Sequence, residues 1–255
     1  KDLETLLESR EKTLVSLMHI NNEIGTILDL QRVAELCKSK GALFHSDSVQ
    51  SVGHYRLDLQ TTPIDFLAAS AHKFHGPKGI GFVFIRKNSG LKPLIHGGMQ
   101  ERGVRAGTES IHDIVGLDAS LALSYQNLED EMAQVKTLKT YFIDQLKSKI
   151  DGVKFNGCCS DFDKSTYTLV NVCLPVSEAN APMFLFQLDL KGIACSKGSA
   201  CQSGSDKGSH VLTQILSEED LKKPSIRFSF SIYNTKEEID RVVETLCSLI
   251  HPIAS

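Results

Sequence analysis

Apolar residues in the first ninety positions recur in short runs, separated by polar or glycine-containing turns. Between the first two runs, apolar residues fall at helical spacing, with Asp29 in place to cap the helix start and Gly41 after its last turn. The four runs predict buried strands: "TLVSLMHI" (Thr13–Ile20), "ALFHSDSVQ" ending near Asp47, "IDFLAASAHK" (Ile64–Lys73) and "GIGFVFIRK" (Gly79–Lys87). Nearly continuous apolar strands around a helix predict an α/β fold whose mostly parallel sheet is covered on both faces.

After Gly107 the pattern becomes helical over about forty residues, and we expect a bend near Gln126–Glu129. Short strands and helices alternate in the remainder. Thr235 and Glu238 have the spacing of a capping box at the start of a final amphipathic helix. This change in the pattern of apolar residues predicts two domains, a partial large domain over residues 1–128 and a smaller α+β domain over residues 129–255.

Composition narrows the class of protein. The chain has 255 residues, 41% of them hydrophobic and 23% charged, with a net charge of −3, which is typical of a globular protein and favours neither nucleic acid nor a membrane surface as a partner. No apolar stretch has a spanning length, and no signal peptide opens the chain. The first residues read as a helix entering a strand, so we expect that an N-terminal piece is absent.

Seven cysteines, an odd number without a regular framework, predict free thiols in a reducing cytoplasm. The histidines and cysteines lack the spacing of zinc ligands, so no metal site is expected.

Polar side chains cluster where the predicted parallel strands end. Ligands of such sheets bind beyond the carboxyl ends of the strands, which makes this edge a predicted site. The residues at these ends are Asn21, Asn22, Asp47, Gln50, His72 and Lys73.

Lys73 is the candidate nucleophile of this site. A lysine in isolation is most simply a solvated charge, but Lys73 follows the apolar run "FLAAS" and precedes the glycine-rich turn "HGPKGIG". Partial desolvation at a strand end lowers the pKa of an amine and lets it attack carbonyls. Pyridoxal phosphate uses such a lysine and needs a carboxylate beside its ring nitrogen. Asp47 is the candidate carboxylate, and the alternative role for Asp47 is to cap the turn that follows it.

Five segments together resemble the pyridoxal-phosphate-dependent cysteine desulfurases, which are class V aminotransferases of fold type I. The resemblance extends from Val15 to the final helix. The segments, in the order of the family's motifs, are "HINNEIGT", "HSDSVQSVG", "SAHKFHGPKGIG", "HGGMQERGVRAGT" and "GSACQSG".

The resemblance implies a role for each matching residue. Lys73 would be the Schiff-base lysine, and Asp47 would pair with the pyridinium nitrogen. The remaining implied contacts are Gln50 with the phenolic oxygen, Ser70 and His72 with the phosphate, Asn22 with cofactor and substrate carboxylate, Thr108 with the phosphate of the other subunit in a homodimer, and Arg227 with the substrate carboxylate. A guanidinium suits that last contact, although Arg227 is otherwise an ordinary charge on a strand.

Cys201 is the residue that would carry sulfur. Its neighbours in "KGSACQSGSDKGSH" are small and polar, as expected of a mobile thiol and unlike the apolar surroundings of a buried cysteine. Cys195, which ends the apolar run "GIAC", is the competing candidate, and we assign it to packing. The family's upstream phosphate-binding threonine and ring-stacking histidine match no residue of this sequence, so we expect an incomplete large-domain sheet.

The implied activity is removal of sulfur from L-cysteine, giving alanine and a persulfide on Cys201 for transfer to an acceptor protein, for example an iron–sulfur scaffold. Three alternatives remain at this point: a selenocysteine lyase, another enzyme of the same cofactor such as an aminotransferase or β-lyase, and a non-catalytic scaffold of the same fold.

Overall fold

The structure is a computed structural model that describes residues 2–8, 11–198 and 208–250. The chain forms two compact units. Unit 1 consists of Lys1–His19 and Leu28–Leu128, and unit 2 of Ile20–Ile27 and Glu129–Ser255. The assignment of 1–128 and 129–255 as two domains stays a prediction, and the membership of Ile20–Ile27 in unit 2 is a feature that the sequence did not indicate.

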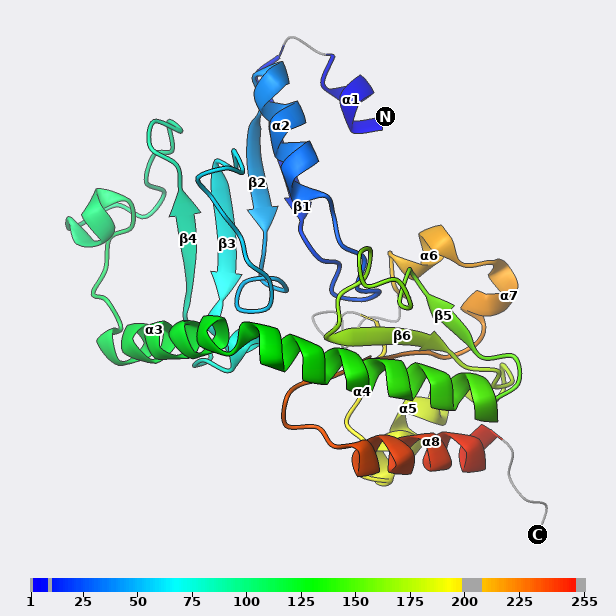
Figure 1. Cartoon of the computed structure of the whole chain (residues 1–255). Helices are drawn as coiled ribbons and strands as arrows, with labels where there is room; N and C mark the ends of the chain where they lie inside the picture. Colours follow the sequence, from blue (N-terminus) through cyan, green and yellow to red (C-terminus); the bar gives the residue numbers. More distant parts are fainter. Residues whose placement is uncertain (1, 9–10, 199–207, 251–255) are drawn as a thin grey trace. The chain divides into compact units, whose positions relative to one another are not determined.

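Unit 1 is built around a four-stranded sheet in the order β1-β2-β3-β4 (Figure 1). Strands β1, β2 and β3 are parallel, and β4 pairs with β3 in the antiparallel direction. The predicted parallel-dominated sheet is therefore confirmed. Its elements are α1 (Asp2–Leu6), β1 (Leu14–Met18), α2 (Leu30–Lys40), β2 (Leu43–Asp47), β3 (Phe66–Ser70), the 3₁₀ helix η1 (Ala71–Phe74), β4 (Gly81–Ile85), the 3₁₀ helix η2 (Gln100–Gly103) and α3 (Ile111–Gln126).

Local sequence signals fix the ends of α2 as predicted. The side chain of Asp29 accepts a hydrogen bond from the Arg32 amide at 3.1 Å, and Gly41 ends the helix in the left-handed conformation, at φ 72°. The third strand differs from its prediction. It stops at Ser70, and Ala71–Phe74 form a turn of 3₁₀ helix in place of further strand, because Ala71 and Phe74, three residues apart, are both buried in the core of unit 1.

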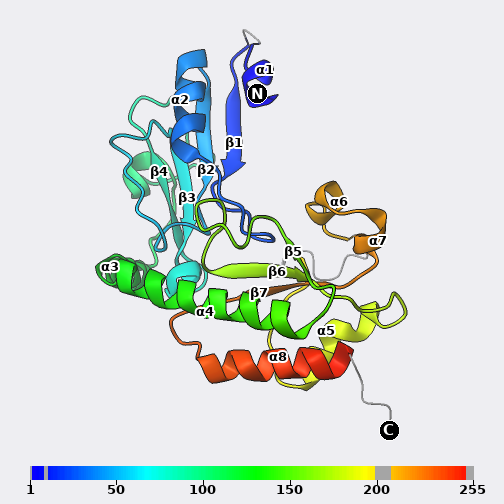
Figure 2. The ribbon, with the colours of Figure 1, turned by 45° about the vertical axis from the view of Figure 1, so that its right-hand side comes forward.

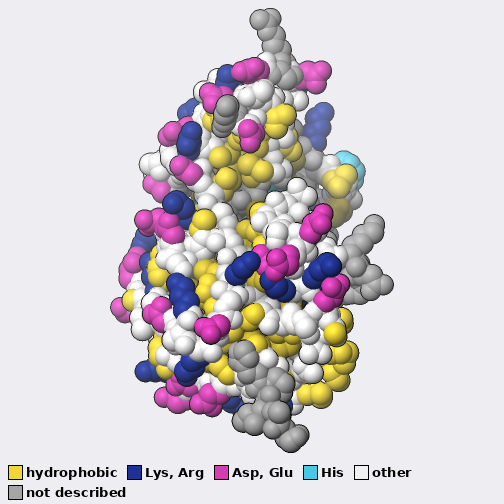
Figure 3. Space-filling model, turned by 90° about the vertical axis from the view of Figure 1, so that its right-hand side faces the viewer, with side chains coloured by type: hydrophobic (Ala, Val, Ile, Leu, Met, Phe, Trp, Pro, Cys, Tyr) yellow, Lys and Arg dark blue, Asp and Glu magenta, His cyan; other side chains and the backbone are white. Residues whose placement is uncertain are grey.

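The edge of the sheet at β1 is apolar. Leu14 and Leu17 on this strand have 57% and 37% of their surface exposed, and β1 ends the strand order within the described residues. The prediction that this strand is buried is therefore wrong for the described chain, in which only Val15 of β1 is buried. Figure 3 shows hydrophobic side chains gathered in its upper part, the region of unit 1. Edge strands are usually protected by charged residues, and β1 carries none.

Unit 2 contains an antiparallel three-stranded sheet in the order β5-β6-β7. The long helical region is interrupted at Asn127, as the predicted bend requires, so that α4 begins one residue later. The elements are α4 (Leu128–Lys149, from Glu129 on in unit 2), β5 (Lys154–Asn156), β6 (Leu169–Cys173), α5 (Ala181–Leu190), α6 (Leu212–Ile215), α7 (Glu218–Leu221), β7 (Ser225–Ser229) and α8 (Lys236–Ile250).

The two faces of the unit 2 sheet carry different kinds of side chain, apolar on one face and mostly polar on the other. Val170, Val172, Ile226 and Phe228 alternate along β6 and β7 and join one hydrophobic core with residues of α4, α5 and α8; these helices lie together on one side of the sheet in Figures 1 and 2. Because side chains alternate across a strand, the residues between them point to the other face. Asn171 and Arg227, which are direct register partners, lie on that face.

The start of α8 is closed by the predicted capping box. The Thr235 amide donates to Glu238 Oε2 at 3.1 Å, and the Glu238 amide donates to Thr235 Oγ1 at 3.2 Å. Ile239, Val243 and Leu246 are buried along one stripe of the helix. Within the described residues, no helix combines the length and the apolar character that crossing a bilayer requires.

Residues 20–27 form a tight loop that hydrogen-bonds to unit 2. Asn21 Oδ1 accepts from the amides of Glu23 and Ile24, at 2.9 and 3.0 Å, and Gly25 adopts φ 75°. A Cβ atom on Gly25 would lie 3.0 Å from Leu169 Cδ1, so glycine allows both the turn and its close packing. The loop is tied to unit 2 by backbone bonds from Thr166 N to Gly25 O and from Ile27 N to Lys164 O, both 2.8 Å.

Lys139 on α4 supports this connection from inside unit 2. Its side chain is fully buried, and its ammonium donates to Thr166 O at 2.6 Å and to Ser165 Oγ at 3.3 Å. Burial lowers the pKa of Lys139 to about 8. Unit 2 therefore holds the 20–27 loop with a buried lysine that is costly to keep charged.

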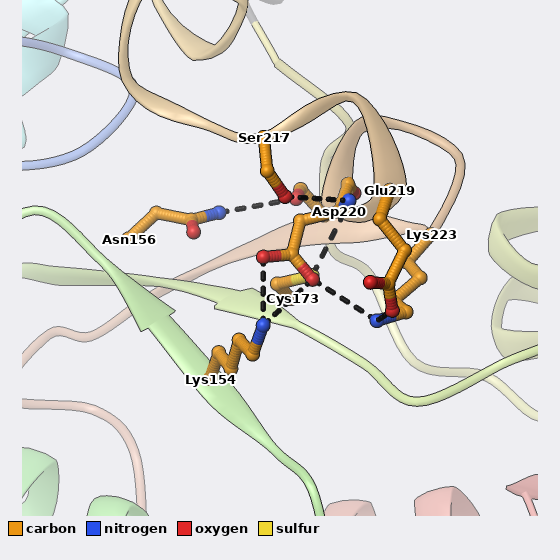
Figure 4. A network of polar contacts seen from close by, with 8 residues as sticks. Lys154, Asn156, Cys173, Ser217, Glu219, Asp220 and Lys223 are labelled. Atoms are coloured by element: carbon orange, nitrogen blue, oxygen red, sulfur yellow. Dashed lines mark hydrogen bonds and ion pairs between the residues drawn. The ribbon is translucent and has the colours of Figure 1, made fainter.

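An ion-pair network joins β5 to α7 at another part of unit 2 (Figure 4). Lys154 Nζ donates to both oxygens of Asp220, at 2.9 and 2.7 Å, and Lys223 Nζ donates to Asp220 Oδ1 at 3.0 Å and to Glu219 Oε1 at 2.8 Å. The bonds from Lys154, and then those from Lys223, lower the pKa of Asp220 to about 2. Asp220 is thus the acceptor that connects Lys154 on β5 with Lys223, which follows α7.

His19, directly after β1, is buried with 7% of its surface exposed. Its amide donates to Asp47 O at 2.9 Å, and its Nδ1 atom has no hydrogen-bond partner among the described residues. Burial lowers the pKa of its imidazole to about 4, so the ring is neutral at neutral pH.

We predict that Asp220→Asn lowers the thermal unfolding midpoint at pH 7, because the two lysines lose a shared charged acceptor. The folded-state pKa lies below the ordinary value of 3.8, so the contribution of Asp220 is fully present above pH 3.8 and is lost as the pH falls toward 2. Calorimetry at pH 7 and near pH 2 measures the difference in unfolding midpoint between Asp220→Asn and the original protein. Glu219→Gln, which removes one exposed ion pair, should have a smaller effect at pH 7, and equal effects of the two variants would contradict the prediction.

We also predict that His19 makes the protein less stable in mild acid. The unfolded chain binds a proton near pH 6.5, whereas the folded state resists protonation down to about pH 4, so stability decreases as the pH falls through this window, by at most about 3 kcal/mol. His19→Asn should flatten this dependence in urea unfolding curves between pH 7 and pH 5. His96→Asn controls for loss of an exposed imidazole; a His19→Asn profile parallel to that of the original protein would disprove the assignment.

Candidate active site

Lys73 lies on η1, immediately beyond the carboxyl end of β3. Ser70 precedes the helix with an extended backbone, at φ −133° and ψ 127°. Within η1, Ala71 and Phe74 are buried, while His72 is exposed and Lys73 is half-buried. This arrangement follows from the three-residue repeat of a 3₁₀ helix, which anchors one side of the turn in the core and leaves the other side for polar residues.

The turn after β2 holds η1 in place through His54. The Nε2–H group of His54 donates to the backbone carbonyl of Lys73 at 2.9 Å. Burial lowers the pKa of His54, while the hydrogen bond to Lys73 O acts in the opposite direction. The imidazole is thus a fixed donor that positions the Lys73 backbone. Sequence reasoning assigned His54 no function, because the contact joins residues 19 positions apart.

Gly53 permits the close approach of this turn to η1. It adopts φ 81°, and a Cβ atom at this position would lie 2.5 Å from the Cβ atom of Phe74. Both the conformation and the contact exclude a larger residue. The core residue next to Lys73 is therefore packed directly against the backbone of the β2 turn.

Asp47 ends β2 and is exposed. Its Oδ1 atom accepts from the Val49 amide at 3.1 Å, which is the capping role that the sequence left as an alternative. Oδ2 has no hydrogen bond within the part of the chain that the structure describes, so one carboxylate oxygen remains for a ligand. Gln50 follows in the same turn and is half-buried.

The structure gathers five of the predicted residues at one edge of unit 1. Asp47 is the register partner of Ala68 on β3, and Ser70 follows two residues later. Because β2 and β3 are parallel, their carboxyl ends meet at the same edge. The residues gathered there are Asp47, Gln50, Ser70, His72 and Lys73.

Thr108 lies in another part of unit 1. It is exposed and lines a cavity of about 1080 Å³ together with β4 and the start of α3. Arg102 and Arg105 also line this cavity, whereas none of the five residues at the β2–β3 edge does. Within this chain, Thr108 is therefore not grouped with the candidate lysine.

Asn22 and Arg227 come together in unit 2. Arg227 Nη1 donates to the backbone carbonyl of Asn22 at 2.7 Å, and the Arg227 backbone exchanges two hydrogen bonds with Ser196, at 2.7 and 3.1 Å. Burial lowers the pKa of Arg227, and the negative charge of Glu23 partly offsets that effect. Glu23 lies within the motif "HINNEIGT", but sequence reasoning gave it no role.

Cys201, the predicted sulfur carrier, lies outside the described residues, as does the rest of 199–207. Cys195 is half-buried, and burial followed by the charge of Asp189 raises the pKa of its thiol to about 11. A thiol of that pKa is almost entirely protonated at neutral pH and is a poor nucleophile. The assignment of Cys195 to packing remains a prediction, and the partial burial of its thiol supports it.

Comparison with known proteins places these residues in a family context. The aminotransferase class-V family matches residues 1–242. A cysteine desulfurase IscS of Dictyoglomus turgidum is 37% identical over 252 residues, which are 99% of this chain and 62% of that protein. The chain thus spans about three fifths of the length of this curated relative.

Two solved structures share the fold. A NifS-like protein from Rickettsia africae matches with a TM-score of 0.85 and 31% identity, over 98% of this chain and 66% of that structure. A structure described as SspA in complex with cysteine matches with a TM-score of 0.71 and 30% identity, over 91% of this chain and 63% of that one. Together with the family match, this likeness confirms the predicted fold type, and the chain belongs to the aminotransferase class-V family.

Proposed function

We propose that this chain carries the catalytic residues of a pyridoxal-phosphate-dependent cysteine desulfurase. The observation that carries the proposal is the group of an amine, a carboxylate, an amide, a hydroxyl and an imidazole at the carboxyl ends of β2 and β3. The likeness to cysteine desulfurase IscS and to a protein described in complex with cysteine supports the choice of substrate.

The residues present fit the cofactor of this family. Asp47 offers the unengaged Oδ2 atom to a protonated ring nitrogen, and Gln50 lies in the same turn. Ser70 and His72 offer a hydroxyl and an imidazole to a phosphate at the start of η1, and Lys73 offers its amine to an aldehyde. When bound, pyridoxal phosphate would supply an electron sink that stabilises negative charge at the substrate Cα.

The protein's own groups would then divide the work. Lys73 would move the proton at the substrate Cα, with its backbone fixed by His54. Asn22 and Arg227 would hold the substrate carboxylate. The Cys201 thiolate would attack the substrate sulfur, so that the carbon–sulfur bond breaks, a sulfur–sulfur bond forms, and L-cysteine and a thiol become alanine and a persulfide without any external oxidant.

The partners follow from the same chemistry. A persulfide is a carrier, so we propose an acceptor protein for its outer sulfur, such as an iron–sulfur scaffold. Thr108 and its basic neighbours Arg102 and Arg105 lie apart from the Lys73 group, which agrees with a contact to the phosphate of a second subunit in a homodimer. A cytoplasmic location and preference for cysteine over selenocysteine belong to the same proposal.

We predict that Lys73→Ala removes covalent attachment of pyridoxal phosphate and lowers desulfurase activity at least about 100-fold. Borohydride reduction followed by peptide mass spectrometry should place a pyridoxyl label on Lys73 in the original chain and on no peptide of the variant. Lys78→Ala, at an exposed position of the following turn, should keep the label. A label on another lysine would overturn the assignment.

We predict that Cys201→Ser abolishes persulfide formation while leaving the absorbance of bound cofactor unchanged, because a hydroxyl cannot accept sulfur in this exchange. Trapping with an alkylating reagent and intact mass measures the persulfide. Cys195→Ser should retain it, since burial keeps that thiol protonated. Persulfide on the Cys201→Ser chain at the original level would contradict the proposed carrier.

A further inference from the structure

Glu23 is a buried carboxylate whose backbone is fixed on both sides. Its surface is 0% exposed. Its amide donates to Asn21 Oδ1 at 2.9 Å, and its carbonyl accepts from the Nδ2 atom of Asn171 at 3.0 Å. Because Asn171 is itself fully buried on β6, the backbone of Glu23 is held by the sheet of unit 2.

One carboxylate oxygen of Glu23 binds Ser209, just after the undescribed segment 199–207. The Ser209 hydroxyl donates to Glu23 Oε2 and accepts from the amides of Val211 and Leu212, at 3.2 and 3.0 Å. On the other border, a Cβ atom on Gly198 would lie 3.6 Å from Glu23 Oε2 and 3.6 Å from Ser209 Cβ. Glu23 thus anchors Ser209, and the backbone of Gly198 lies close to this pair.

Arg227 is the second residue that Glu23 affects, through its other carboxylate oxygen and its negative charge. Glu23 Oε1 and Arg227 Nε are both buried and have no hydrogen-bond partner among the described residues. The His210 Nδ1 atom lies 4.0 Å from Oε1, on a side chain that is 69% exposed. A buried carboxylate with an unengaged oxygen is costly. Arg227 Nη1 donates to the carbonyl of Asn22, the residue directly before Glu23, at 2.7 Å. The negative charge of Glu23 favours the charged form of this arginine, which gives a physical reason for an acid at this position.

We propose that Glu23 is a positioning residue with two separable tasks. Through Oε2 it anchors Ser209, and through its charge it stabilises the guanidinium of Arg227, which donates to the neighbouring Asn22 carbonyl. The first task fixes the position of Ser209, just after the segment 199–207 that contains Cys201. The second sets the group that would bind the substrate carboxylate. The kinetic consequences rest on the proposed desulfurase function, whereas the anchoring itself does not.

Two variants separate the tasks. Glu23→Gln keeps an oxygen that can accept from Ser209 but removes the charge, so it should raise KM for L-cysteine about tenfold with little change in kcat. Ser209→Ala keeps the charge but removes the anchor, so it should lower kcat for persulfide formation about tenfold or more, with KM unchanged, since small misplacements of reacting groups are costly. Glu23→Ala should show both effects.

Ser217→Ala is the matched control. Ser217 Oγ accepts from the Asp220 amide at 3.2 Å at the start of α7, as Ser209 Oγ accepts from amides at the start of α6, but Ser217 has no contact with Glu23. This variant should keep both kinetic constants. If Glu23→Gln and Ser209→Ala change KM and kcat in parallel, or behave like Ser217→Ala, the two-task proposal is wrong.

Hydrogen exchange tests the anchoring without any activity. In Glu23→Ala, the amides of Val211 and Leu212 should exchange at least about tenfold faster than in the original chain, whereas Glu23→Gln should leave them nearly unchanged. Unchanged exchange in Glu23→Ala would overturn the anchoring. An original chain that binds cofactor but forms no persulfide would instead refute the proposed function, and the exchange result would still decide the role of Glu23.

Discussion

The hydrogen bonds that tie residues 20–27 to the rest of unit 2 are the constraint that holds Asn22 against Arg227 and fixes the backbone of Glu23. Asn171 donates to Glu23 O, Thr166 donates to Gly25 O, and Ile27 donates to Lys164 O. These residues follow β1 directly along the chain, and His19, one position earlier, is bonded to Asp47 in unit 1. A stretch of nine residues therefore contributes polar groups to both units.

Buried polar groups concentrate around this stretch, and each has a physical cost. Burial lowers the pKa values of His19, Lys139 and Arg227, because each charged form loses contact with water. The costs are met differently. Two hydrogen bonds offset the cost of burying Lys139. In contrast, His19, Glu23 and Arg227 each have one buried atom without a hydrogen-bond partner within the described residues. Incomplete satisfaction of this kind is rare in interiors that serve only packing.

The two units offer complementary chemistry. The edge of unit 1 carries the amine of Lys73, the carboxylate of Asp47 and the groups suited to a phosphate, while unit 2 carries Arg227 and Asn22, suited to a carboxylate. In the function that we propose, the first set would bind the cofactor and the second would bind the substrate carboxylate. This division agrees with membership of the aminotransferase class-V family, in a chain that spans about three fifths of the length of its curated relative.

The sequence by itself determined the features that depend on neighbouring residues. The Asp29 cap and the Thr235–Glu238 box are encoded within a few positions, and both were found where they were predicted. Each of the four apolar runs also contains a strand, although the third strand stops at Ser70. The placement of Asp47 and Lys73 at one edge also followed from local patterns, because parallel strands end together. The motif likeness identified the family for the same reason, since each motif is a short contiguous stretch.

Only the tertiary structure decided the contacts between distant residues. The end of β3 at Ser70 depends on how Phe74 packs against Gly53, and the bond from His54 to Lys73 O depends on the same packing. Glu23 meets Ser209 across 186 positions. No periodicity or capping signal encodes such pairs, because their geometry is set by the packing of whole elements. The sequence around an isolated acid is also the same whether the folded chain buries that acid or exposes it.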